Sequence, residues 1–370
     1  MKRRFIRTFF LAASWFVFNQ AGLALDLGDV LPDFSLPGTD GKPHSPADYK
    51  EKKLLAVVFL SNHCPTSQRF QDRLISLARE YGPKGLAVVA ISPNHPQAIP
   101  LDELAFSDLG DSLEDMKSRA KRKMYPFPYL YDGQTQGVTK SFGAAATPHA
   151  FLFDQKRILR YAGRIGDLDN ENRLDRQELF QAVESLLNGK PPPVEKTKVY
   201  GGTIRKRENA YIAEGMLKRF SRETVYLKKT TVQKLEFMRR NKSVRTKLFF
   251  VWSSENPKIR SLLLTLSEVH KIYRKRGLEW VTVNVDGEDH EEHVHSLLKE
   301  THASGRNFFC RGAAISPLAD LRGERGDQVT PYLAVVRPGG AVSYRSTSGL
   351  DLLELKRQIL VALNKKSSHE

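Results

Sequence analysis

The first half of the chain alternates short apolar runs with amphipathic segments, and one cysteine lies at a junction between the two. Residues 54–60 are seven consecutive apolar side chains, which predicts a strand buried on both faces. Behind them, apolar side chains from Phe70 to Tyr81 fall at i, i+4, i+7, i+8 and i+11, which predicts an amphipathic helix over 67–81. Cys64 directly precedes Pro65, a residue that fits the first turn of a helix. The pattern therefore places Cys64 where a central strand leads into a helix N-terminus.

The same alternation continues to residue 188 and predicts an α/β fold with a mixed sheet. An N-terminal hairpin is expected within 26–50, with Asp40-Gly41 as its turn. The expected strands are 85–91, 128–131, 149–153 and 158–163, and the expected helices are 112–123, 135–142 and 176–188. Residues 93–111 contain three prolines and are expected to be an irregular insertion.

The second half of the chain repeats this plan. Residues 189–193 end in three prolines and predict a stiff linker, followed by a basic connector with helices near 208–220 and 231–240. Strands are then expected at 248–252, 280–285 and 329–336, and helices at 257–276, 290–301 and 351–363. We therefore predict four parts: a leader over 1–24, a first domain over 25–189, a connector over 190–241 and a second domain over 242–370.

The position of Cys64 favours thiol chemistry. Unpaired backbone N–H groups and the helix dipole at a helix N-terminus stabilise a negative charge. A thiol there forms the thiolate more readily, and the thiolate is the nucleophile. The alternative is a small buried core residue, the common fate of a free cysteine.

Several short motifs together resemble the redoxin branch (AhpC/TSA-like) of the thioredoxin superfamily. They are the segments 31–36, 40–42, 62–65, 147–148 and 161–164. The resemblance covers roughly residues 26–190. The second half has its elements in a similar order and spacing, and Thr330-Pro331 mirrors Thr147-Pro148, so two thioredoxin-like folds in tandem are expected. The resemblance also implies that Cys64 is the nucleophile, that Pro148 is cis and packs against the thiol, and that Thr147 and Pro148 present an edge for a bound peptide.

The sequence departs from that family at the positions of the partner thiols. Ser67 replaces the second cysteine of the C-x-x-C site, where its hydroxyl can donate a hydrogen bond to the thiolate; the alternative is an ordinary residue in the first turn of the helix. Ser61 supplies a hydroxyl three residues before Cys64. Gly202 stands where some members carry a further cysteine. In the second half, Glu255 and Lys258 fall at or near the two thiol positions, which predicts a redox-silent domain. Cys310 is expected in a loop over 307–314.

Composition narrows the function further. The formal charge is +16, but the bases are dispersed without interleaved aromatic residues, so nucleic-acid binding is not expected. Two cysteines exclude a disulfide framework and a cysteine-rich metal site. The acidic and histidine-rich stretch 286–295 is more typical of a helix start than of a metal site. No cofactor is predicted.

The first 24 residues are interpreted as a secretory signal peptide. A basic start precedes the short apolar stretch 9–18, and small residues stand at the −3 and −1 positions of a cleavage site before Leu25. This predicts a periplasmic or secreted protein. An uncleaved anchor is the alternative and would associate the protein with the inner membrane.

These observations predict a thiol-dependent oxidoreductase in which Cys64 attacks a peroxide or a disulfide. With Ser67 and Gly202 in place of thiols, an external thiol or a protein reductant would complete the cycle, and no resting bond between Cys64 and Cys310 is expected. The rival hypothesis is a non-catalytic binding or scaffold protein built on two degenerate thioredoxin folds.

Overall fold

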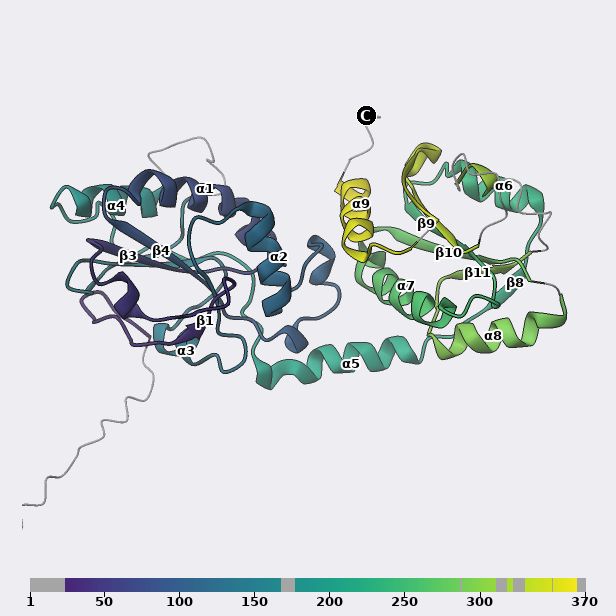
Figure 1. Ribbon diagram of the computed structural model, residues 1–370, viewed down its shortest axis with the longest axis horizontal. Helices are drawn as coiled ribbons and strands as arrows, with labels where there is room; N and C mark the ends of the chain where they lie inside the picture. Colours follow the sequence, from purple (N-terminus) through teal and green to yellow (C-terminus); the bar gives the residue numbers. More distant parts are fainter. Residues whose placement is uncertain are drawn as a thin grey trace, which may run out of the picture.

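The computed structural model describes residues 24–167, 177–286, 288–310, 318–321, 330–347 and 349–364. Figure 1 shows two α/β units, with helix α5 (Ala210–Ser221) running between them. The predicted signal peptide lies outside the described residues, apart from Ala24. Among the helices that are described, none is both long and apolar enough to cross a membrane.

The described part of the first unit is built on a five-stranded sheet in the order β5-β4-β3-β6-β7. Strands β3, β4 and β5 are parallel, whereas β6 is antiparallel to both β3 and β7. Their bounds are β3 Leu54–Phe59, β4 Leu86–Ser92, β5 Tyr129–Tyr131, β6 His149–Phe153 and β7 Leu159–Gly163. Strands β3 and β4 are buried along their whole length, as their continuous apolar runs predicted. A separate short hairpin joins β1 Leu36–Pro37 to β2 Pro43–His44 around the predicted Asp40-Gly41 turn.

Helices cover both faces of this sheet. Side chains of α1 (Pro65–Tyr81), α2 (Leu113–Lys123) and α4 (Glu178–Leu187) pack in one core, and those of α3 (Gly137–Phe142) pack in the other. The insertion 93–111 contains the short 3₁₀ turns η2 (Pro96–Ala98) and η3 (Leu104–Phe106) rather than longer elements, because its three prolines interrupt regular structure. The predicted α/β fold with a mixed sheet flanked by helices is confirmed.

The second unit repeats this arrangement in the order β13-β12-β9-β10-β11-β8, with β12 antiparallel to β9 and β13. Its strands are β8 Leu227–Lys229, β9 Thr246–Trp252, β10 Leu278–Asn284, β11 Arg306–Phe309, β12 Tyr332–Val336 and β13 Val342–Ser346. Helices α7 (Ile259–Tyr273), α8 (Glu291–Glu300) and α9 (Leu352–Asn364) share one core, and α6 (Val232–Arg240) contributes to the other. Both units contain a cis X-Pro bond before a central antiparallel strand, at Thr147-Pro148 and at Thr330-Pro331.

Two expectations about the region between and after the units need correction. The predicted connector 190–241 is divided: Lys196 and Gly202 pair with the first unit, whereas β8 and α6 belong to the second. The predicted loop 307–314 is wrong at its start, because Asn307–Phe309 lie in β11 and Cys310 follows that strand as a buried side chain. The strand was missed because it is short and begins with polar residues.

Candidate functional site

Cys64 is positioned by the junction that the hydrophobic pattern predicted. Strand β3 ends at Phe59, three polar residues turn the chain, and Cys64 is the N-cap of α1, with Pro65 at the first helical position. The side chain is 1% exposed. The thiol is therefore held at a helix N-terminus but is closed off from solvent.

Three backbone groups surround the sulfur atom. The N–H groups of Ser67 and Gly202 donate to Cys64 Sγ, at 3.4 and 3.2 Å. The thiol in turn donates to the carbonyl of Thr147 at 3.1 Å. After deprotonation the two N–H donors remain in place to stabilise the thiolate.

The hydroxyl groups of Ser67 and Ser61 hold the loop rather than the sulfur. Ser67 Oγ accepts from the N–H of Ser61 at 3.3 Å, and no hydrogen bond from this hydroxyl to Cys64 Sγ appears among the described residues. The backbone N–H of Ser67 donates to the sulfur, because the side chain of an N-cap residue faces the amide three residues on. Ser61 Oγ accepts from the N–H of Cys64 at 3.2 Å.

The Thr147-Pro148 element lies against the thiol, and its bond is cis, as predicted. Its edge is already occupied, because Thr147 and Gly202 exchange two backbone hydrogen bonds of 3.0 and 2.9 Å. Thr147 Oγ1 is buried and has no hydrogen-bond partner among the described residues. This hydroxyl is a donor that remains available beside Cys64.

A buried charged network beside Cys64 was missed by the sequence analysis. His63 Nδ1 lies 2.9 Å from Asp111 Oδ2, and Asp111 Oδ1 accepts from the N–H of Asn62 at 2.6 Å. Asn94 Nδ2 donates to Asp111 Oδ2 at 2.6 Å. Asp111 comes from the irregular insertion, so no periodicity linked it to the Cys64 loop.

The protonation states of this pair follow from their mutual contact. Burial alone would lower the pKa of His63, but the Asp111 carboxylate, together with Glu103, raises the pKa above its usual value. Burial would raise the pKa of Asp111, but His63 and the hydrogen bonds hold it below its usual value. The contact therefore favours the charged form of each side chain, directly before Cys64.

Comparisons with known proteins identify this part of the chain. The profile of the AhpC/TSA family matches residues 27–162. This part of the chain belongs to the AhpC/TSA family. The chain is also 25% identical, over 160 residues, to the thioredoxin-like protein YneN of Bacillus subtilis (strain 168), covering 43% of this chain and 84% of the relative.

Two solved structures have a higher sequence identity to this chain than YneN has. A hypothetical protein from Sinorhizobium meliloti 1021 is 35% identical, with 50% of this chain and 96% of that chain covered and a TM-score of 0.44. An uncharacterized conserved protein from Geobacillus kaustophilus is 34% identical, with 49% and 93% covered and a TM-score of 0.44.

Two arginines, in β7 and directly after it, are engaged with carboxylates. Arg160 pairs with Asp154 at 2.7 Å, and Arg164 pairs with Glu178. The structure thus provides the Ser67 and Gly202 amides at the sulfur, and no arginine contact with it appears in the described part of the chain.

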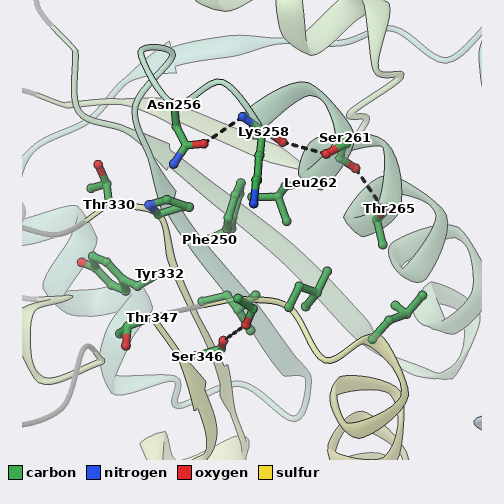
Figure 2. Close-up of a pocket in the computed structure, with 15 residues that line it drawn as sticks. Phe250, Asn256, Lys258, Ser261, Leu262, Thr265, Thr330, Tyr332, Ser346 and Thr347 are labelled. Atoms are coloured by element: carbon green, nitrogen blue, oxygen red, sulfur yellow. Dashed lines mark hydrogen bonds between the residues drawn. The ribbon is translucent and has the colours of Figure 1, made fainter.

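The second unit carries no thiol at the corresponding junction. Helix α7 begins at Ile259 with Lys258 as its N-cap, and a cavity of about 570 Å³ lies between this end of α7, the cis-Pro331 loop and the end of β13. Figure 2 shows Phe250 at its floor and the Lys258 ammonium reaching over it. Within the described ranges, no group of acidic, histidine and cysteine side chains could hold a metal ion.

Proposed function

We propose that the AhpC/TSA domain is a thiol-dependent oxidoreductase in which Cys64 is the single nucleophile. The observation that carries the proposal is the pair of backbone N–H groups, from Ser67 and Gly202, directed at Cys64 Sγ at a helix N-terminus. Such donors stabilise a thiolate, and the thiolate attacks peroxides and disulfides.

Both candidate half-reactions begin with attack by Cys64 Sγ, and they differ in the leaving group. With a hydroperoxide, the Cys64 thiolate takes the terminal oxygen, the O–O bond breaks, and an alkoxide or hydroxide leaves and is protonated. With a disulfide, the thiolate forms a mixed disulfide and releases one thiolate. The free hydroxyl of Thr147 supports either reaction as a donor to the leaving atom.

A thiol from outside the chain regenerates Cys64 in this proposal. Cys310 is buried after β11 of the second unit, and burial raises the pKa of its thiol, which disfavours the reactive thiolate. The external thiol or protein reductant attacks the mixed disulfide, or condenses with the sulfenic acid and releases water. The predicted export of the protein would place this exchange in the periplasm or outside the cell.

A second candidate function is a non-catalytic binding protein. The observation that favours it is the closure of the site: Cys64 is 1% exposed and its neighbouring edge is occupied by Gly202. In that case Cys64 would be a structural thiol under a fixed cover.

The deciding experiment is turnover of hydrogen peroxide, and separately of glutathione disulfide, with dithiothreitol as the external thiol. The proposal expects turnover by the wild-type chain and by Cys310→Ser, and its loss in Cys64→Ser. Equal residual rates in wild type and Cys64→Ser for both oxidants would leave the binding protein as the function.

A further inference from the structure

Residues 195–205, which we name the strap, cross the Cys64 site after leaving the AhpC/TSA domain. The beginning of the strap is fixed to β7: the N–H of Ala162 donates to the carbonyl of Glu195 at 3.0 Å, and the N–H of Thr197 donates to the carbonyl of Ala162 at 3.1 Å. Thr197 Oγ1 also accepts from the N–H of Arg164 at 2.9 Å. The strap therefore starts as an added strand segment on the edge of the sheet.

The middle of the strap is two glycines that lie directly on the thiol. A Cβ atom on Gly202 would stand 2.9 Å from Cys64 Sγ, and a Cβ atom on Gly201 would stand 2.0 Å from the carbonyl oxygen of Thr147. Real Cβ atoms essentially never approach so closely, so a side chain at Gly202 would have to shift the Cys64 side chain, and one at Gly201 would have to displace the strap from the Thr147 backbone. The glycine backbone at the centre of the strap thus packs directly against Cys64.

The end of the strap is held by Arg205. Its guanidinium pairs with Glu103, and its N–H donates to Asn94 Oδ1 at 2.7 Å. Its carbonyl accepts from the N–H of His95 at 2.9 Å and from Gln136 Nε2 at 3.0 Å. The insertion that carries Glu103 therefore fixes the end of the strap.

The second unit packs against that same insertion. Arg357 of α9 lies 3.3 Å from Asp108, and three further contacts come from the end of α7 and the turn after it and reach residues on both sides of Glu103. They are Tyr273 Oη to the carbonyl of Ser107 (2.8 Å), Lys275 to Asp102 (2.6 Å) and Arg276 to the carbonyl of Ala105 (2.8 Å). Helix α5 follows the strap in sequence and leads into the second unit, so the backbone also joins the strap to the unit that docks beside it (Figure 1).

From these contacts we infer that docking of the second unit on residues 102–107 holds the strap closed over Cys64. Cys64 becomes accessible to a reactant when that docking is released and Gly201 and Gly202 leave Thr147; the N–H of Ser67, which belongs to α1, then remains as the donor to the sulfur. This docking gives the redox-silent unit a gating role. This gating role deepens the proposed function and rests on it in one respect, that Cys64 is the nucleophile.

The test is the rate at which iodoacetamide alkylates Cys64 in the folded full-length chain, measured by peptide mass spectrometry. Gly201→Ala should raise the rate about tenfold or more, since its Cβ cannot coexist with the Thr147 carbonyl and about two backbone hydrogen bonds are lost. Gly215→Ala in α5 is the matched control, because its Cβ meets nothing within 4 Å, and it should leave the rate unchanged.

The gating role is tested by weakening the docking surface alone. Tyr273→Phe combined with Lys275→Ala and Arg276→Ala should raise the Cys64 rate by about threefold or more. Adding Gly201→Ala should then produce no faster rate than Gly201→Ala alone. An unchanged Cys64 rate in the docking variant would overturn the inference.

Cys310 serves as the internal control for the fold of the second unit. Its rate should stay constant in every variant, because it is buried away from the docking surface. If the triple variant exposes Cys310, the single Tyr273→Phe variant decides, since it keeps the buried ring and removes only the bond to Ser107. Alkylation does not depend on turnover, so a failed gate and a failed oxidoreductase assay give different results.

Discussion

The contact between Gly202 and Cys64 predicts the outcome of restoring a second thiol. In Gly202→Cys, the new Cβ atom would lie 3.2 Å from the Cβ of Cys64, before any adjustment. The two Cβ atoms of a disulfide are usually about 3.5–4.5 Å apart, so a shift of a few tenths of an ångström suffices. We therefore expect this variant to form an internal disulfide with Cys64 on mild oxidation.

The size of the effect follows from the loop that such a bond would close. The two positions are 138 residues apart in sequence. Loop-closure entropy then gives an upper value of about 5 kcal/mol for the stabilisation of the folded chain by the disulfide, and strain in the native state reduces it. We expect the oxidised form to melt on the order of 5–10 °C above its reduced form.

Non-reducing mass spectrometry and thiol titration measure the crosslink. The oxidised Gly202→Cys chain should lose two hydrogen atoms and keep one free thiol, that of Cys310. Gly201→Cys is the matched control, because that position faces the Thr147 carbonyl and not the sulfur. If Gly202→Cys kept all its thiols after oxidation, or if Gly201→Cys crosslinked equally well, the described strap geometry would be refuted.

Two further predictions concern the site loop and the core. The pKa of His63 is raised in the folded chain, whereas histidines in the unfolded chain titrate near about 6.5. Protonated His63 therefore contributes to the free energy of unfolding. This contribution is complete below about pH 6.5 and is lost as pH rises through the raised pKa. Urea unfolding at about pH 5.5 and about pH 8.5 should show that loss in wild type, and an identical loss in Asp111→Asn would contradict the assignment. Phe142→Ala, which removes a fully buried ring, should cost about 3–5 kcal/mol in the free energy of unfolding. Phe237→Ala, at a side chain that is 71% exposed, should stay within about 0.5 kcal/mol, and similar costs at both positions would show that the core is wrongly placed.

Much of the fold was predictable because its central elements carry strong patterns. Strands β3 and β4 are continuous apolar runs, and α1 has a clear amphipathic period, so their positions were predicted to within one or two residues. The short strands β8 and β11 were not predicted. Three or four residues carry too little periodicity to distinguish a strand from a loop.

The candidate site was predictable where chemistry is local in sequence, and less so where it is not. Cys64 and its helix N-terminus follow from neighbouring residues, and Thr147-Pro148 follows from the family motif. The pairing of His63 with Asp111 joins residues 48 positions apart through an irregular insertion, which no hydrophobic pattern reports. The contact of Gly202 with the thiol likewise depends on the path of the strap.

The central claim is that Cys64 is a nucleophile, and intact-mass analysis of the protein after brief exposure to glutathione disulfide tests it most directly. The chain should gain one glutathione, mapped to Cys64, and lose it on addition of dithiothreitol, while Cys310 remains unmodified. The strap-opened Gly201→Ala variant should gain it faster. If Cys64 stayed unmodified both in wild type and in Gly201→Ala, with the chain still folded, Cys64 would be a structural thiol and the proposed oxidoreductase function would be wrong.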